Sequence, residues 1–163
     1  MVKILKLVHF LAVMMILTGC SKNYIVGDTI PLSEIYSVSI AGSDGMTFSS
    51  QWSYFAYRNS HGKETYIEWM HWDEEKRDVV TDRFDIPDEK YEEILAVIDG
   101  CKYVKDPKPD KHVMDAPSFS GVRIGWMGGG SNDYHIESPD ENVNITAEVI
   151  KAIRNAAGID SEQ

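Results

Sequence analysis

Two neighbouring stretches rich in aromatic residues place the strongest constraint on how this chain can fold. Residues 51–58 and 64–72 are each predicted to form a β-strand, since aromatic residues are typical of strands. The segment between them, 59–62, is typical of a tight turn, so the stretches predict an antiparallel hairpin with Arg58 opposite Lys63. This pairing would place on the core face Trp52, Tyr54, Ala56, Thr65, Ile67 and Trp69.

The other face of this hairpin is the candidate binding surface. It would carry Phe55, Tyr57, Tyr66 and Trp72, edged by Glu64, Glu68 and Arg83. Aromatic rings beside charged groups can stack on sugars or anchor a protein partner. The alternatives are that another part of the chain packs on this face, or that its rings form ordinary cross-strand pairs on a solvated sheet.

Two further strands would extend the hairpin into a four-stranded meander. Residues 35–41 alternate before it, and 78–84 form a shorter strand after it. The expected core-facing residues of these two strands are Tyr36, Val38, Ile40, Val80 and Phe84. Asp82 would then point inward, which is tolerated at the edge of a sheet, where an inward charge blocks further pairing.

Two amphipathic helices are predicted from apolar spacing and from the residues at their ends. The first would run from Pro87 to Gly100, and the second from Asn144 to Ala157 with Gly158 after it. Their apolar stripes are Tyr91, Ile94, Leu95 and Ile98 in the first helix and Ile145, Val149, Ile150 and Ile153 in the second.

The segment between the helices predicts a long loop and a second hairpin. Val104–Ser120 contains three prolines and would be a loop, and loops of this length are often functional or disordered. Residues 121–127 and 133–137 would pair around a glycine-rich turn. The expected fold is therefore a single α+β domain: a mainly antiparallel sheet, made of a four-strand meander plus a hairpin, with two helices packed on one face.

The N-terminal segment has the three-part build of a secretory signal. Two lysines precede an apolar run, residues 7–17, that is too short to span a membrane. The tetrapeptide Leu-Thr-Gly-Cys at 17–20 resembles the lipobox of bacterial lipoproteins. This resemblance implies that residues 1–19 are removed and that Cys20 becomes a diacylglycerol-modified N-terminus. An ordinary signal peptide or an uncleaved anchor is the alternative.

The same resemblance implies a protein anchored to a cell membrane by lipid and facing away from the cytoplasm, in the periplasm or at the cell surface. Residues 20–33 would form a tether, 34–158 the folded domain and 159–163 a loose tail. Removal of residues 1–19 from the 163-residue chain leaves 144 residues, which is enough for one domain with its own core.

The charge of the chain argues against nucleic acid as a partner. The net charge is −10, and it becomes −12 without residues 1–19, which hold two lysines and no acidic residue. Phosphates are held by clusters of Lys and Arg, and such clusters are absent from this sequence. An excess of acidic residues favours solubility and association with a basic partner.

The sequence leaves catalysis open and predicts neither a metal site nor a cofactor. Cys101 has no second cysteine to pair with once Cys20 is acylated, and a lone cysteine is more often buried than catalytic. The glycines at 128–130 lack the Lys-Ser/Thr ending of a phosphate-binding loop. The histidines His61, His71, His112 and His135 lie on separate predicted elements and never reach a metal-ligand spacing.

Three function classes follow from these observations. The leading one is a lipid-anchored binding module for a protein, a peptide or a glycan. The second is a small cell-envelope enzyme whose His, Asp and Glu residues meet only in the fold. The third is a structural subunit of an envelope assembly, with the aromatic face as its interface.

Overall fold

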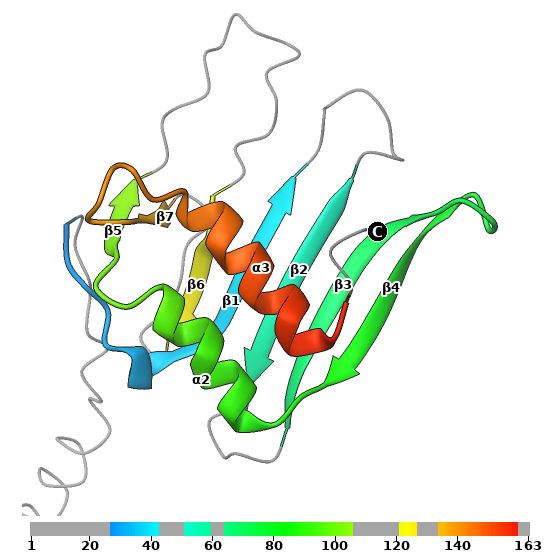
Figure 1. Ribbon diagram of the computed structural model, residues 1–163, viewed down its shortest axis with the longest axis horizontal. Coiled ribbons are helices and arrows are strands. Elements are labelled where there is room, and N and C mark those ends of the chain that lie inside the picture. The colour runs from blue at the N-terminus through cyan, green and yellow to red at the C-terminus, as the bar shows by residue number, and fades with distance from the viewer. Residues whose placement is uncertain (1–26, 43–50, 60–63, 106–120, 127–133, 160–163) are drawn as a thin grey trace, which may run out of the picture.

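A five-stranded antiparallel sheet forms the centre of the computed structural model, which describes residues 27–42, 51–59, 64–105, 121–126 and 134–159 (Figure 1). Its strand order is β4-β3-β2-β1-β6. The strands are β1 (Ile35–Gly42), β2 (Trp52–Arg58), β3 (Thr65–Asp73), β4 (Asp78–Asp85) and β6 (Arg123–Trp126). A separate pair of strands, β5 (Lys102–Lys105) and β7 (Tyr134–Glu137), lies beside it. The predicted α+β class is confirmed.

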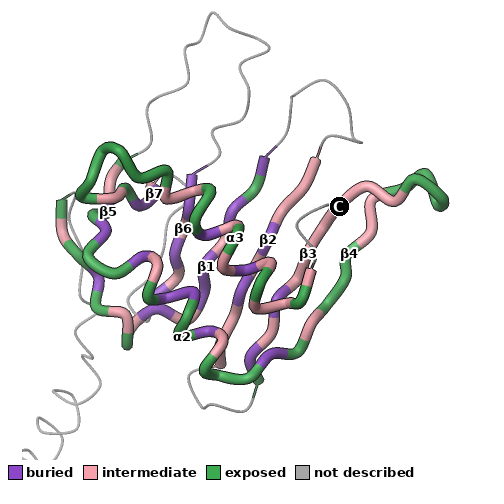
Figure 2. The backbone as a smooth tube through the Cα atoms, in the orientation of Figure 1, coloured by how far each residue is buried: buried purple, intermediate pink, exposed green. Residues whose placement is uncertain are grey.

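Both described helices, α2 (Asp88–Val97) and α3 (Ile145–Ala157), cover the same face of the sheet (Figure 1). The buried stretches concentrate where these helices cross β1 and β2 (Figure 2). The core joins Val38, Ile40, Tyr54, Ala56 and Ile67 of the sheet to Tyr91, Ile94, Leu95, Val149 and Ile153 of the helices. Each large apolar side chain buried here contributes about 1.5–3 kcal/mol to the stability of the fold.

The helix ends follow the predicted chemistry. Pro87 precedes α2, and Asn144 caps α3 by accepting a hydrogen bond from the backbone N–H of Ala147 at 3.2 Å. Gly158 ends α3 in the left-handed conformation, at φ 70°, which glycine adopts without steric cost. No helix in the described ranges is long and apolar enough to cross a membrane.

The hairpin of β2 and β3 keeps its predicted faces but pairs two residues away from the predicted register. Arg58 lies opposite Thr65, not Lys63, and Tyr57 lies opposite Tyr66. Because side chains alternate with a period of two, a shift of two residues exchanges partners without exchanging faces. In the β3–β4 pair, Trp72 lies opposite Val79.

Asp82 lies opposite Trp69, on the predicted side of the sheet, but it is exposed, and β4 is an edge strand among the described strands. Its carboxylate lies 3.0 Å from the His71 ring nitrogen Nε2. The Asp82 side chain is 54 % exposed. The β3–β4 edge of the sheet lies to the side of both described helices (Figure 1).

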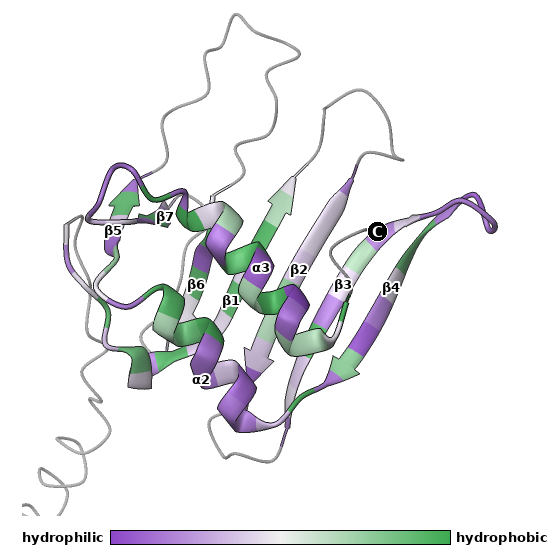
Figure 3. Cartoon of the chain, in the orientation of Figure 1, coloured by the Kyte–Doolittle hydropathy of each residue, from purple (hydrophilic) through white to green (hydrophobic). Residues whose placement is uncertain are grey.

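Trp52 and Trp69 lie on the predicted core side, but they are only partly buried, although the sequence predicted two largely buried rings. Both pack at the margin of the core cluster, and neither is enclosed in it. Figure 3 shows why hydropathy alone does not mark these strands: β1 is strongly hydrophobic, whereas the aromatic β2 is pale.

The prediction for Tyr36 is wrong. The ladder between β1 and β6 shifts between Ile35 and Ser37, which is a β-bulge. The bulge turns Tyr36 away from Val38 and Ile40, and its ring lies 6.1 Å from the ring of Tyr57 on the opposite face. Strict alternation does not anticipate a bulge.

The second hairpin is also wrong in its pairing. β6 pairs with β1, and β7 pairs with β5, whereas within the described residues one bridge, between Val122 and Ile136, joins the two predicted partners. The free edge of β1 pairs with β6 in the main sheet, where Val38 lies opposite Ile124. Lys102–Lys105, partly assigned to the long loop, is a strand because Tyr103 is buried and stacks on Tyr134 at 4.8 Å.

Residues 27–30, expected to belong to the tether, are part of the folded domain. The backbone N–H of Gly27 donates to the carbonyl oxygen of Tyr103 at 2.8 Å, and Ile30 is buried. A 3-10 turn, η1 (Leu32–Glu34), then leads into β1. Cys20, the 1–19 segment and residues 106–120 of the predicted loop lie outside the described residues.

Candidate functional site

Four aromatic rings form a continuous group on the sheet face that is turned away from α2 and α3. We call Tyr36, Phe55, Tyr57 and Tyr66 the aromatic cluster. The ring centroids of Tyr57 and Tyr66 are 5.2 Å apart, and those of Phe55 and Tyr57 are 6.0 Å apart. All four side chains are partly exposed. Rings at such distances stabilise one another by about 0.5–1.5 kcal/mol per pair.

Backbone register accounts for this grouping. Tyr57 and Tyr66 are directly opposite in the β2–β3 ladder, and Phe55 follows Tyr57 at the next position on the same face. Tyr36 joins them from β1 only because of the bulge. The alternation of residues 35–41 therefore did not place Tyr36 on this face, although a glycine at position 125 is consistent with a large side chain passing close to its backbone.

Arg83 of β4 places a positive charge on the aromatic cluster. Its guanidinium carbon lies 3.7 Å from the centroid of the Tyr66 ring, which is a cation–π contact. Glu64 forms an ion pair with the same guanidinium, and Asp85 accepts from its Nε at 3.3 Å. These two carboxylates raise the pKa of Arg83 and hold its side chain over the ring.

Glu68 lies within the same face but has no such partner. It stands opposite Phe55 on one side and Arg83 on the other. Arg83 nevertheless turns to Glu64 and Asp85, and no residue in the described part of the chain forms a hydrogen bond or ion pair with the Glu68 carboxylate. Glu68 is partly exposed and is therefore open to a charged ligand.

The Tyr66 hydroxyl is held in its neutral form. Burial raises the pKa of Tyr66, and the negative charges of Glu68 and Glu64 raise it further, against the opposing effect of Arg83. A neutral phenol both donates and accepts hydrogen bonds. The cluster thus combines apolar ring surface, a neutral hydroxyl and a carboxylate.

The structure brings together six of the seven predicted face residues and separates the seventh. Trp72 is on the same side of β3 but lies opposite Val79 at the far end of the strand, and no ring contact in the described ranges links it to the cluster. Met70, which the sequence analysis did not consider, is the residue between Glu68 and Trp72 on this face.

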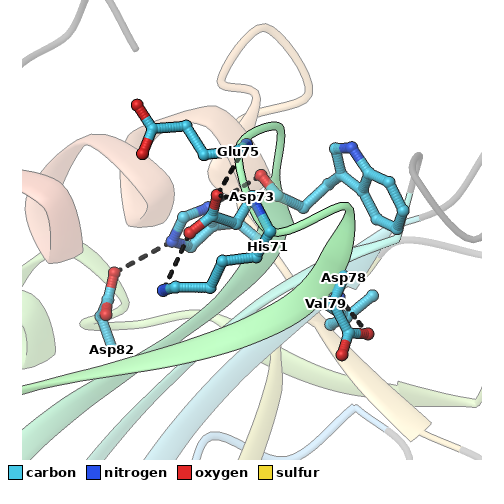
Figure 4. Close-up of polar contacts among 8 residues, drawn as sticks. His71, Asp73, Glu75, Asp78, Val79 and Asp82 are labelled. Carbon is cyan, nitrogen blue, oxygen red and sulfur yellow. Dashed lines mark hydrogen bonds and ion pairs between the residues drawn. The ribbon is translucent and has the colours of Figure 1, made fainter.

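A second aromatic row lies on the helix side of the sheet. Tyr54 stacks on Trp69 at 6.1 Å, and Trp69 stacks on the imidazole of His71 at 3.8 Å. His71 then contacts Asp82, and Asp73 at the start of the β3–β4 turn binds Lys76 at 2.9 Å (Figure 4). These contacts hold His71 against Asp82 and Lys76 against Asp73 at this end of the sheet.

The groups that a reaction would require are dispersed among the described residues. No three His, Cys, Asp or Glu side chains in these ranges are close enough to hold a metal ion. His71 is bound to Asp82, and the buried His135 is bound to Glu137 in the smaller sheet. Cys101 is buried, and burial raises the pKa of its thiol. His61, His112 and the glycines at 128–130 lie outside the described residues.

No protein-family model, no curated protein and no solved structure matches this chain. The aromatic cluster and its charged edge are therefore the features from which a function can be proposed.

Proposed function

We propose that this protein is a lipid-anchored binding protein that faces away from the cytoplasm and holds a macromolecular partner on its aromatic cluster. The observation that supports the proposal most directly is the joining of four partly exposed rings on the sheet face opposite both described helices. The lipobox-like residues 17–20 support the anchor.

The energetics of the cluster favour a partner. Burying one large apolar side chain contributes about 1.5–3 kcal/mol, and rings that stay partly in water forgo part of this free energy. Tyr and Arg are also the residue types that concentrate binding energy at the centres of protein interfaces. Tyr57, Tyr66 and Arg83 lie together on this face.

An acylated N-terminus suits a presenting role. Each buried methylene contributes about 0.8 kcal/mol, so two or three acyl chains hold a protein at a membrane without a polybasic patch. The domain would then present its sheet face to partners near the membrane surface.

The test is capture of a partner by the full-length tagged protein in its native cells. The variant Tyr57→Ser with Tyr66→Ser should retain the melting temperature of the parent to within a few degrees and lose the captured partner. Tyr134→Ser, which changes a partly exposed tyrosine of the smaller sheet, should capture normally. A folded double variant that captures the same partner contradicts the proposal, and an unfolded double variant shows that the cluster belongs to the core.

A further inference from the structure

The aromatic cluster already binds one cation of its own chain. The Arg83 guanidinium lies on the Tyr66 ring and is flanked by the carboxylates of Glu64 and Asp85. A ring face with carboxylates at its edge is a favourable environment for a guanidinium or ammonium group, because the π-electrons and the anions attract it together. This internal contact shows what kind of group the surface accommodates.

Glu68 provides the same combination at a position that the chain leaves open. It is directly opposite Phe55 in the β2–β3 ladder, and the rings of Tyr57 and Tyr66 adjoin Phe55 at 6.0 and 6.4 Å. Arg83 lies opposite Glu68 in β4, yet its Nε donates to Asp85 and its Nη2 to Glu64. A carboxylate among rings, without an ion pair in the described ranges, is suited to a cation that comes from outside.

We infer that the aromatic cluster recognises a basic protein segment, with an arginine or lysine of the partner placed on the rings beside Phe55 and paired with Glu68. This inference rests on the proposed function and names its partner class. The excess of acidic residues, which gives the chain a net charge of −10, attracts such a segment from a distance and raises its association rate.

Other occupants fit these contacts less well. A neutral sugar ring could stack on the cluster, but it would leave the Glu68 carboxylate without a charged partner in the described ranges. A second copy would carry the same acidic excess, which opposes its association with this face. A basic segment instead complements both the rings and the charge.

The test uses the full chain in nanodiscs of neutral phosphatidylcholine and a dye-labelled peptide with two arginines among glycines. Its counterpart carries citrulline, which keeps the shape of arginine and removes the charge. Fluorescence polarisation at physiological salt gives both affinities. The arginine peptide should bind at least about tenfold more tightly than the citrulline peptide.

Two variants with the same change in net charge locate the site. Glu68→Gln should weaken binding of the arginine peptide about five- to tenfold, whereas Glu141→Gln, at an exposed turn before α3, should change it less than about twofold. Phe55→Leu removes the ring but keeps an apolar side chain, and it should weaken binding about threefold. This variant keeps the test decisive if Glu68→Gln does not fold.

Equal losses in Glu68→Gln and Glu141→Gln, or equal binding of the arginine and citrulline peptides, would overturn the inference. So would saturable binding of a neutral oligosaccharide, or self-association, that depends on Tyr57 and Tyr66. If the Tyr57→Ser, Tyr66→Ser variant loses its partner while Glu68→Gln retains it, the proposed function stands and the inference fails. If neither variant loses the partner, both the proposed function and the inference are contradicted.

Discussion

The ring of Tyr36 occupies the space that a side chain at Gly125 would need. A Cβ atom at Gly125 would come within 3.0 Å of Tyr36 Cε2 and within 2.5 Å of Ser37 Oγ. The β-bulge of β1 turns both side chains toward this one residue of β6. A glycine at position 125 leaves room for the side chains of Tyr36 and Ser37. This space allows the Tyr36 ring to join the aromatic cluster.

Gly125→Ala should destabilise the fold by about 1–3 kcal/mol, because the added methyl group overpacks a closed contact. Urea unfolding followed by circular dichroism measures this loss. In a Ser37→Ala background, where the Oγ atom is absent, the same substitution should cost less. A Gly125→Ala variant as stable as the parent would show that Tyr36 is free to move away.

The partly buried tryptophans should contribute less than fully enclosed core residues of the same size. Trp69→Ala removes the stacking on Tyr54 and His71 and should cost about 2–4 kcal/mol. Ile67→Ala, at a residue with 0 % exposure, should cost about as much despite its smaller side chain. Denaturant midpoints compare the two. A Trp69→Ala midpoint equal to that of the parent would mean that its contacts contribute nothing.

Elements that depend on local patterns were predictable from the sequence. The helix of Tyr91, Ile94 and Leu95 follows from the spacing of its apolar residues, and the cap at Asn144 follows from the residue type at the helix end. Both signals lie within a few neighbouring residues of the sequence. The faces of the β2–β3 hairpin survived a wrong register, because the error was two residues. Six of the seven predicted face residues consequently lie together.

Features that depend on distant partners were not predictable. The choice of β6 to pair with β1, and of β7 to pair with β5, is decided by which strand edges are available after folding. The bulge that brings in Tyr36 depends on Gly125 in another strand. Trp72 was assigned to the candidate binding surface because it lies on the same face of β3 as Tyr66. The two residues are near opposite ends of this strand, so they do not lie together.

Asn144 should stabilise α3 through its cap. Asn144→Ala removes the hydrogen bond to the Ala147 N–H and should cost about 1 kcal/mol. Asn155→Ala, at an exposed position inside the same helix, should leave stability unchanged or raise it slightly, because alanine has the higher helix propensity. Thermal unfolding of both variants distinguishes a lost cap from a general effect of replacing asparagine, and equal effects would contradict the assignment.

Cys101 should be unreactive in the folded domain. Burial raises the pKa of its thiol, and the negative charge of Asp99 adds to this effect, so the reactive thiolate is disfavoured. Iodoacetamide at pH 8 should modify Cys101 slowly in the native protein and rapidly in urea, as peptide mass spectrometry would show. Rapid modification of the native protein would indicate an open site.

The same shift in pKa gives a pH dependence of stability. The unfolded thiol loses its proton at a lower pH than the folded one, so the contribution of Cys101 is constant below the unfolded pKa and decreases as pH rises above about 9. A Cys101→Ala variant should show a smaller loss of stability than the parent between pH 8 and pH 10. Parallel pH profiles of the two proteins would contradict this account.

The lipid anchor is predicted from residues 17–20 and can be tested independently of the binding surface. If Cys20 carries the diacylglycerol, Cys20→Ala should abolish incorporation of a clickable fatty acid and leave the protein either unprocessed or released from membranes. Cys101→Ala is the matched control, since it removes the other of the two cysteines and should leave labelling intact. Label that persists in Cys20→Ala and disappears in Cys101→Ala would move the anchor to the folded domain. Label in both variants would contradict the assignment of Cys20 as the residue that carries the lipid.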